Sequence, residues 1–186
     1  MALNRWQFFG VFLRDWRVAS VTPTSRRAVV RLCRAVDFAL PQTVVELGPG
    51  SGAFTRYLLS RLPAGSRVVA IEQNAHFAAA LRSSITDPRL TVVEGSAEHL
   101  RELLSSHGVR SADVVLSGIP FSVFSRPRQQ EILRQVAEVL APAGVLLAYQ
   151  FSSQLAAVLP AVFPRRDHFR LWWNIPPLHC FVARLR

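Results

Sequence analysis

Residues 44–54 read Val-Val-Glu-Leu-Gly-Pro-Gly-Ser-Gly-Ala-Phe, and this stretch decides the fold. A short apolar run leads into an acid, glycines follow at three alternate positions, and a helical pattern begins at Phe54. The pattern predicts a buried parallel strand, a tight turn and the start of a helix. Because glycine adopts positive φ and allows close backbone approach, a flat or anionic ligand can lie directly on this turn. A glycine-rich loop alone also fits a plain strand–helix connection, so its surroundings must decide.

A second apolar strand, Arg-Val-Val-Ala-Ile-Glu at residues 67–72, follows the glycine loop and also ends in a carboxylate. The spacing of about 20 residues suits one βαβ unit whose acid, Glu72, binds the hydroxyl pair of a ribose. A nicotinamide dinucleotide would use the same acid. However, the glycines fall as Gly-x-Gly-x-Gly after an acid, and the dinucleotide fingerprint Gly-x-Gly-x-x-Gly is not met.

The composition predicts one α/β domain spanning residues 1–186 in a cytoplasmic protein. Half of the residues are hydrophobic, which excludes a disordered chain. Two cysteines, Cys33 and Cys180, are too few for a disulfide framework or a metal cluster, so we expect no bound metal. No apolar run reaches the roughly 18 residues that span a bilayer, and arginines interrupt the apolar N-terminus, which argues against a signal peptide.

The formal net charge is +10, and all 22 basic residues are arginine. Arginine binds phosphate through two parallel hydrogen bonds, so the charge indicates a polyanionic partner, either nucleic acid or an anionic membrane. Charge alone does not choose between these partners. A solvated basic face that reflects a compositional bias toward arginine gives the same balance.

Residues 1–20 are predicted to form an amphipathic helix with a wide apolar stripe flanked by arginines. An aromatic-rich stripe of this kind is typical of a helix that lies in a membrane interface, where tryptophan favours the headgroup layer. The alternative is a lid folded over the helix's own domain, and a lid that opens at a membrane satisfies both. The predicted membrane-contacting residues are Trp6, Phe9, Phe12, Leu13 and Trp16.

Predicted strands and helices follow one another to the end of the chain. Further strands are predicted at residues 90–93, 112–116, 145–151, 168–173 and 178–185, with helices at 97–107 and from 127 and a turn at 142–144. The succession of strands and helices predicts a mostly parallel sheet with helices on both faces, and the last two runs are consistent with the antiparallel terminal hairpin of the family that the motifs below resemble. Ligands of such sheets bind at the carboxyl ends of the strands, where the segments 94–97 and 117–122 lie.

The Glu-Leu-Gly-Pro-Gly-Ser-Gly motif at residues 46–52 resembles the first motif of class I S-adenosylmethionine (SAM)-dependent methyltransferases. The resemblance covers nearly the whole chain. It implies a Rossmann-like, seven-stranded class I methyltransferase fold, SAM as cofactor and S-adenosylhomocysteine as product. An acid usually contacts the adenine amine where this chain has Ser96, so a hydroxyl, Glu94 or the backbone must take that role. The cofactor-binding residues implied by the resemblance are Glu46, Gly48, Gly50, Ser51, Gly52, Phe54, Glu72, Gln73, Ser96, Ala97, Ser117, Gly118 and Ile119.

The acceptor loop, residues 117–122, bears on which amine is methylated. In adenine and cytosine amino-methyltransferases an Asn or Asp precedes the proline and aromatic residue of this loop and polarises the base amine. Here Gly118-Ile119-Pro120-Phe121 keeps the proline and the aromatic residue, but Gly118 stands where those enzymes have the side chain of Asn or Asp. An aliphatic amine is nucleophilic once it is deprotonated and needs no such polariser. A proline-rich turn with a core phenylalanine is the alternative for this loop.

Taken together, the motifs resemble the bacterial phospholipid N-methyltransferases of the soluble, membrane-associating type. The matching segments are the aromatic N-terminus, Thr-Pro-Thr-Ser at 22–25, the glycine motif, Ile-Glu-Gln-Asn at 71–74, the acceptor loop, Tyr-Gln-Phe at 149–151 and Asn-Ile-Pro-Pro at 174–177. The resemblance implies stepwise methylation of phosphatidylethanolamine toward phosphatidylcholine at an anionic membrane surface, by a cytoplasmic protein with peripheral membrane association. A weaker resemblance to ribosomal RNA adenine dimethyltransferases keeps RNA and small-molecule acceptors open, and a non-catalytic SAM- or lipid-binding module is a further alternative.

Residues with suitable chemistry for the acceptor are less sharply defined. A general base must lie within hydrogen-bond reach of the amine, and the candidates are Tyr149 and His179, although His179 also fits a buried, satisfied histidine. Aromatic faces can hold a methylated ammonium by cation–π contact, and arginine can bind lipid phosphate; core packing and exposure to solvent are the respective alternatives. The predicted substrate-binding residues are Trp16, Arg26, Pro120, Phe121 and Tyr149.

Overall fold

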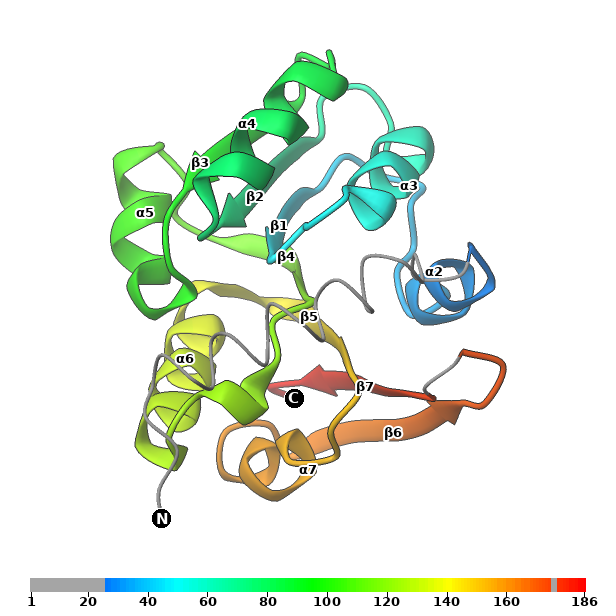
Figure 1. Ribbon diagram of the computed structural model, residues 1–186, viewed down its shortest axis with the longest axis vertical. Coiled ribbons are helices and arrows are strands. Elements are labelled where there is room, and N and C mark those ends of the chain that lie inside the picture. Colours follow the sequence, from blue (N-terminus) through cyan, green and yellow to red (C-terminus); the bar gives the residue numbers. More distant parts are fainter. Residues whose placement is uncertain (1–25, 175–176) are drawn as a thin grey trace.

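The computed structural model of the protein describes residues 26–174 and 177–186 (Figure 1). Its α-helices are α2 (Arg26–Cys33), α3 (Ala53–Arg61), α4 (Ala75–Ser84), α5 (Leu100–Ser106), α6 (Arg126–Val139) and α7 (Leu155–Val158). Its 3-10 helices are η1 (Ala97–His99), η2 (Phe121–Val123) and η3 (Leu159–Ala161). Its strands are β1 (Thr43–Leu47), β2 (Arg67–Glu72), β3 (Leu90–Glu94), β4 (Ala112–Ser117), β5 (Leu140–Gln150), β6 (Arg165–Leu171) and β7 (Leu178–Arg184).

These strands form one seven-stranded sheet in the order β3-β2-β1-β4-β5-β7-β6. Strands β1 to β5 are parallel to one another, whereas β7 is antiparallel to both β5 and β6. The chain builds outward from β1 to β3 and then returns to β4, so β1 and β4 flank the point where the strand order reverses. The predicted Rossmann-like sheet with a C-terminal antiparallel hairpin is confirmed (Figure 1).

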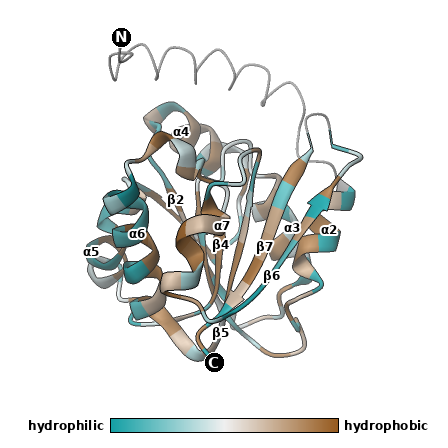
Figure 2. Ribbon diagram, turned by 90° about the horizontal axis from the view of Figure 1, so that it is seen from below, coloured by the Kyte–Doolittle hydropathy of each residue, from teal (hydrophilic) through white to brown (hydrophobic). Residues whose placement is uncertain are grey.

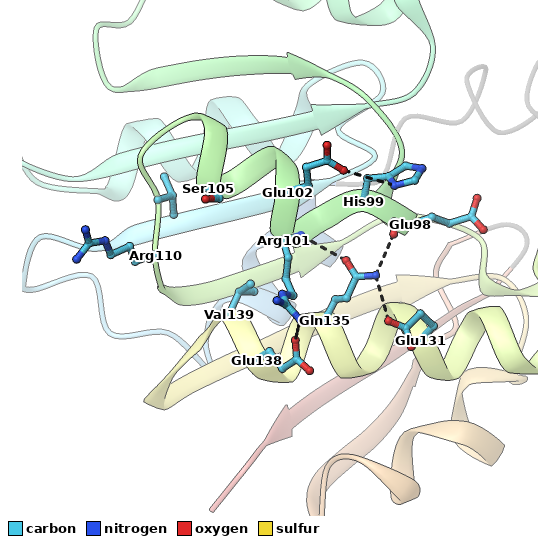
Figure 3. Close-up of a pocket in the computed structure, with 11 residues that line it drawn as sticks. Glu98, His99, Arg101, Glu102, Ser105, Arg110, Glu131, Gln135, Glu138 and Val139 are labelled. Atoms are coloured by element: carbon cyan, nitrogen blue, oxygen red, sulfur yellow. Dashed lines mark hydrogen bonds and ion pairs between the residues drawn. The ribbon is translucent and has the colours of Figure 1, made fainter.

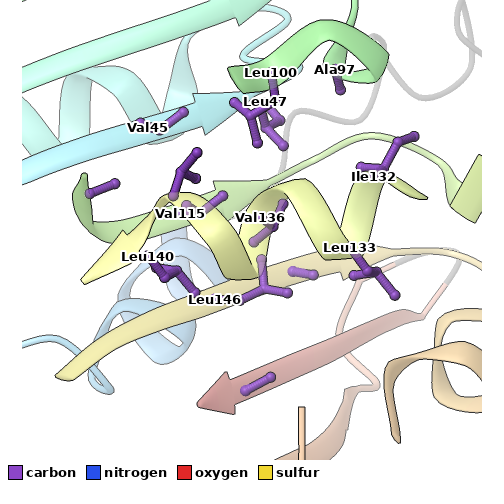
Figure 4. Packing of buried hydrophobic residues seen from close by; sticks show 14 of the residues in the cluster. Val45, Leu47, Ala97, Leu100, Val115, Ile132, Leu133, Val136, Leu140 and Leu146 are labelled. Carbon is purple, nitrogen blue, oxygen red and sulfur yellow. The ribbon is translucent and has the colours of Figure 1, made fainter. Parts of the chain in front are cut away.

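Helices cover both faces of the sheet, and each face has its own hydrophobic core. Alternate strand residues point to opposite faces, so Val45 packs in the core under α5, α6 and α7, while Val44 packs in the core under α2 and α3. Figure 4 shows the first of these cores, where Val136 of α6 lies over the strands that carry Val115 and Leu146. Figure 2 shows the inner strands, largely apolar, between the two helical layers, whereas the edge strand β6 is largely hydrophilic.

Two segments differ from the sequence prediction. Residues 97–107 form η1 followed by α5 instead of one helix, because the Ser96 hydroxyl accepts the N–H of Glu98 and caps a tight first turn. The predicted turn at residues 142–144 lies inside β5, where the register against β4 shifts. Proline has no N–H for the ladder, so pairing breaks at this point and resumes with Val145.

The predicted N-terminal helix, with its stripe of Trp6, Phe9, Phe12, Leu13 and Trp16, lies outside the described residues. Its role as a lid or membrane contact therefore stays a prediction. Arg26 is the first residue of α2. Within residues 26–174 and 177–186, we find no helix with the length and apolar character needed to cross a membrane.

Candidate functional site

The site is built where the loops after β1 and β4 meet at the carboxyl edge of the sheet. The Gly118 N–H donates to the carbonyl of Leu47 at 2.8 Å, and the Gly48 N–H donates to the carbonyl of Ile71 at 2.9 Å. These bonds continue the sheet ladder one residue beyond the strands and fix the glycine loop beside the acceptor loop. Two predicted site segments are thereby brought into direct contact.

The glycine loop needs glycine for conformation and for space. Gly48, Gly50 and Gly52 have φ values of 70°, 54° and 78°, in the left-handed region that side-chain-bearing residues rarely adopt. A Cβ on Gly48 would also lie 3.0 Å from the Cγ2 atom of Ile119. The N–H groups of the three glycines already donate to Ile71, Glu72 and Pro49, so the loop offers a ligand a turn without side chains at the start of α3, where the helix dipole favours an anionic or polar group.

Glu72, at the end of β2, holds the glycine loop from the other side. One carboxylate oxygen accepts the N–H of Gly50 at 3.1 Å, and the other accepts the N–H of Asn74 at 3.0 Å. The residue is buried, with 7% of its surface exposed. Each carboxylate oxygen has a second acceptor position, so Glu72 can receive two further hydroxyl donors without giving up its backbone bonds. A ribose hydroxyl pair is the ligand that matches this arrangement.

Glu46, near the end of β1, is a buried carboxylate with 1% of its surface exposed. Its Oε2 accepts a hydrogen bond from the Thr55 hydroxyl at 2.6 Å, and its Oε1 has no hydrogen-bond partner among the described residues. Burial raises the pKa of Glu46 from 4.5 to about 7; the Thr55 bond opposes this rise, and the nearby Glu72 charge adds to it. An unpartnered buried carboxylate oxygen is a suitable acceptor for a ligand's ammonium group.

The acceptor loop has no room for a side chain at its second residue. A Cβ on Gly118 would lie 2.4 Å from the hydroxyl oxygen of Tyr149 and 3.0 Å from the carbonyl oxygen of Gly48. The Tyr149 ring, on β5, stacks on the ring of Phe54 with centroids 4.5 Å apart. The tyrosine hydroxyl therefore occupies the position beside the loop that a side chain on residue 118 would take.

This environment corrects the prediction that Tyr149 is a general base. Burial, followed by the charge of Glu46, raises the pKa of Tyr149 far above its ordinary value of 10. The phenol therefore stays protonated at physiological pH and cannot take a proton from an acceptor amine. It can still accept a hydrogen bond through its oxygen and donate one through its O–H.

Phe121 is placed differently from the prediction as well. Its ring is 1% exposed and lies in the core under α6 and α7, so it packs the fold and does not face an acceptor. The backbone explains the inward turn, because the Phe121 N–H donates to Gln150 and its carbonyl accepts from Gln129. Pro120, the residue before η2, is half-buried at the edge of the site.

His179 lies on β7 directly beside Gln150 of β5. Its Nδ1 lies 2.9 Å from Nε2 of His168, and the two rings stack. Burial, and after it the charge of Arg170, lowers the pKa of both histidines, so both rings are neutral near pH 7. A neutral imidazole can accept a proton, and the role of His179 as a base stays a prediction.

The remaining predicted cofactor residues lie on loops at the same sheet edge. Gln73 and Ser51 are exposed, directly after β2 and within the glycine loop. Ala97 is buried, and Ser96 is half-buried after β3 with its oxygen engaged in capping η1. The Ser96 O–H remains available as a donor, whereas the usual acid can only accept.

A hollow between α5 and α6 is a separate feature of the helical layer (Figure 3). Its polar groups bind one another: Arg101 pairs with Glu138 at 2.7 Å, and the Gln135 side chain donates to the carbonyl of Glu98 at 2.9 Å. These contacts join the two helices and leave few free donors for a ligand. Across the described chain, no cluster of three or more His, Cys, Asp or Glu side chains is arranged for a metal ion.

The residues present fit SAM, judged on their own geometry. The bare glycine turn accommodates a flat group, Glu72 keeps acceptor positions for a ribose, and the orphaned oxygen of Glu46 matches an amino-acid ammonium. All three features lie at the carboxyl edge beside the switch point, where ligands of open α/β sheets bind.

Comparison with known proteins agrees with this fit. Residues 44–144 match the sequence model of the methyltransferase domain family. The ornithine lipid N-methyltransferase of Singulisphaera acidiphila is 33% identical over 139 residues, which cover 74% of this chain and 72% of that protein. The ribosomal RNA small subunit methyltransferase A of Bordetella pertussis is 34% identical over 102 residues, 55% of this chain but only 36% of that protein.

Solved structures share the fold. The 1,6-didemethyltoxoflavin-N1-methyltransferase of Burkholderia thailandensis, solved with S-adenosylhomocysteine, has a TM-score of 0.71 at 19% identity and covers 98% of this chain and 87% of its own. Human methyltransferase-like protein 13, solved in complex with SAH, has a TM-score of 0.66 at 18% identity, covering 85% and 79% of the two chains. The chain belongs to the class I SAM-dependent methyltransferases, and SAM is its cofactor. The predicted resemblance to this class, lipid N-methyltransferases included, is confirmed.

Some partners of the site were missed in the sequence. The Thr55 hydroxyl donates a hydrogen bond to Glu46, and a hydroxyl residue in the first turn of the helix after the glycine loop was the sequence feature that could have indicated this contact. Gln129 and Gln150 anchor the acceptor loop from two other elements, and no local pattern around either residue indicates that role.

Proposed function

We propose that this methyltransferase transfers methyl groups from SAM to the aliphatic amine of a membrane lipid. Two findings support the proposal. The ornithine lipid N-methyltransferase of S. acidiphila matches this chain over most of both lengths. An ornithine side chain and a phosphatidylethanolamine headgroup both end in an aliphatic amine, so the predicted phosphatidylethanolamine substrate belongs to the same chemical class.

The observation that carries the proposal is the contact between Gly118 and Tyr149. A planar base amine is weakly nucleophilic and benefits from a planar amide beside it, but the 2.4 Å between a Cβ on residue 118 and the tyrosine hydroxyl leaves no place for one. An aliphatic amine carries a full lone pair once it has lost its proton. The loop therefore needs to position such an amine and does not need to polarise it.

In this proposal each part of the site has a separate task. SAM, when bound, supplies a methyl group on a positively charged sulfur, which becomes a neutral thioether as an amine nitrogen accepts the methyl. Glu72 and the glycine loop hold the ribose, and the free oxygen of Glu46 holds the ammonium. The neutral Tyr149 hydroxyl accepts an N–H of the amine and orients its lone pair, while the released proton passes to water. The phenol oxygen is a positioning group throughout.

The surroundings of the site are consistent with a lipid substrate. The excess of arginine suits anionic headgroups, and we propose that residues 1–20, including Trp16, together with Arg26, contact the membrane and the lipid phosphate. This would make the protein a peripheral membrane enzyme of the cytoplasm. The ribosomal RNA methyltransferase relatives favour a second acceptor, an RNA adenine, which the same charge would also attract.

Methyl transfer from labelled SAM tests the two acceptors directly. We would offer phosphatidylglycerol vesicles containing phosphatidylethanolamine, the same vesicles containing ornithine lipid, and total RNA as separate substrates. Label in either lipid fraction, with none in RNA, is the expected result. Label in RNA alone would overturn the proposal and show that Gly118 tolerates a base amine.

A substitution sharpens this assay. Tyr149→Phe keeps the ring that stacks on Phe54 and removes only the hydroxyl. We expect lipid methylation to fall about 10- to 100-fold, the usual scale for losing one positioned hydrogen bond near the reacting atoms, while SAM binding changes less than about twofold. An unchanged methylation rate would remove the positioning role of the hydroxyl.

A further inference from the structure

Large hydrophobic side chains are exposed mainly at one edge of the described structure. Four of them are Val123, Phe151, Trp172 and Trp173, with exposed fractions of 45%, 46%, 65% and 54%. We call these four residues the apolar rim. Leu40, at 72%, precedes β1 and therefore lies at the opposite edge of the sheet.

The sheet pairing places the whole apolar rim at the carboxyl edge, where the site lies. Val123 is in the 3-10 turn after β4, and Phe151 directly follows β5. Because β7 is antiparallel to β5 with His179 beside Gln150, the turn that joins β6 to β7 lies beyond the end of β5. Its described residues 172–174 carry both tryptophans, and Figure 1 shows this part of the chain on the side of α2.

The charge around the apolar rim is almost entirely positive. The arginines nearest to it are Arg170, near the end of β6, and Arg126 and Arg128, at the start of α6, and neither residues 118–130 nor residues 168–174 contain an acid. The guanidinium of Arg170 lies 5.3 Å from the ring centroid of Trp172. An arginine stacked on an exposed tryptophan presents an apolar ring and a phosphate-binding cation at the same point.

We propose that the apolar rim inserts into the headgroup layer of an anionic lipid membrane and thereby presents the carboxyl edge of the sheet to the bilayer. Tryptophan favours this layer because its ring is apolar and its N–H stays hydrated, and nearby arginines bind the phosphates. The inference rests on the proposed lipid substrate for its purpose, but the contact itself concerns residues outside the cofactor and acceptor machinery. It adds a second membrane contact to the predicted N-terminal one.

A membrane suits the apolar rim better than the other possible occupants. Single-stranded nucleic acid stacks on aromatic rings, but Val123 offers no such face and Phe151 shares its edge with small polar residues. A second copy of this chain would bring Arg126, Arg128 and Arg170 against the same positively charged side chains. Acyl chains and anionic phosphates instead match the mixture of aliphatic, aromatic and cationic groups.

The test uses full-length protein and phosphatidylglycerol vesicles that contain no amine lipid and no SAM. We would measure vesicle co-sedimentation of Trp172→Ser/Trp173→Ser and of the matched control Leu40→Ser, whose exposed side chain lies at the opposite edge. The double variant is expected to bind at least about tenfold more weakly, and the control within about twofold of the unaltered protein. Equal vesicle binding by all three proteins would overturn the proposal.

Failure of the membrane proposal can be told apart from failure of the proposed lipid substrate, because vesicle binding is measured without any methyl acceptor. Methylation of detergent-dispersed phosphatidylethanolamine by the double variant should proceed at the unaltered rate. If the variant retains vesicle binding but loses single-stranded RNA binding, or changes from dimer to monomer by light scattering, the apolar rim serves RNA or self-association and the membrane proposal is wrong.

A second measurement avoids the surface substitution in case the double variant folds poorly. In Trp6→Phe/Trp16→Phe the apolar rim supplies the two remaining tryptophans of the chain. Vesicles of phosphatidylglycerol with brominated acyl chains should quench their emission, whereas unbrominated vesicles should shift it to the blue. Emission unaffected by brominated lipid, at concentrations where the protein co-sediments, would refute insertion.

Discussion

Replacing Glu46 by glutamine should stabilise the protein at high pH while weakening its cofactor binding. Glu46 is buried, and burial raises its pKa from the ordinary 4.5 to about 7. The folded state therefore resists ionisation that the unfolded chain undergoes freely. Glutamine has nearly the same shape and can accept the Thr55 hydroxyl bond, but it does not titrate.

The sign and size follow from the two pKa values. Because the folded pKa is the higher one, the contribution of Glu46 to stability is fully present below pH 4.5 and is lost as pH rises through 7. Each tenfold difference in proton binding is worth about 1.4 kcal/mol, so the loss reaches roughly 3 kcal/mol by pH 8. We expect the stability of Glu46→Gln, measured relative to the unaltered protein, to rise by that amount between pH 4.5 and pH 8.

Urea unfolding followed by circular dichroism at several pH values, without cofactor, measures this difference. Any pH-independent effect, such as an unpaired amide N–H in the variant, cancels when the two ends of the pH range are compared. Glu102→Gln is the matched control, since the Glu102 side chain is 84% exposed and should show no such trend. If the stability difference for Glu46→Gln is the same at pH 5 and pH 8, the carboxylate is not held as the structure shows.

The same variant separates stability from binding. The free Oε1 of Glu46 is the acceptor that suits the ammonium of SAM, so a neutral amide in its place should weaken SAM affinity about tenfold or more by calorimetry. A more stable protein with weaker cofactor binding is the pattern expected of a strained functional group. An increase in both stability and affinity would show that Glu46 opposes the cofactor.

Three further substitutions probe the rest of the site. Glu72→Gln should weaken SAM binding about tenfold in a calorimetric titration, while the control Glu102→Gln on α5, whose side chain is 84% exposed, should leave it within about twofold; equal losses would contradict the ribose assignment. Gly118→Ala should reduce methyl transfer at least about 100-fold, because its Cβ meets the tyrosine hydroxyl. The control Gly108→Ala has open space around its Cβ, so it should keep its activity and lose only about 1 kcal/mol of stability to backbone strain in a thermal melt; equal activities of the two variants would refute the crowding argument. The lowered pKa of His168 means that stability falls as pH drops below about 6.5, and His168→Phe should flatten that dependence in urea titrations; an unchanged slope would place the titration elsewhere.

The sheet and its cofactor edge could be predicted because each strand ends where a local pattern ends. The glycine turn after Glu46 and the acid at Glu72 are adjacent in sequence to the strands that position them, so spacing alone locates them. The turn at 142–144 was misplaced for a related reason. Proline and glycine indicate an interruption, but only the partner strand decides whether pairing resumes in the same strand.

The acceptor side was harder to predict because its geometry depends on strand neighbours that are distant in the chain. The Gln150 and Gln129 side chains hold the backbone of Phe121, and this turns a ring that suited the acceptor into the core. Likewise, the contact of His168 with His179 exists only once the β6–β7 register is set. A sequence pattern identifies such residue types but does not determine what they face.

At Gly118 the acceptor loop has no side chain, and the hydroxyl of Tyr149 on the neighbouring strand β5 occupies the space beside it. Gly118 directly follows β4, and Tyr149 lies on the adjacent strand β5. Because Ser117 pairs with Ala148, each of the two residues comes one position after the same strand pair. A side chain absent from the loop is replaced by a hydroxyl from the neighbouring strand, which fills the space and restores one polar atom. An amide offers a planar pair of groups that aligns a flat base amine, whereas a phenol offers a single oxygen. A single contact leaves the other substituents of a tetrahedral amine free, so this geometry supports the proposed aliphatic acceptor for a reason that does not depend on the overall charge of the protein.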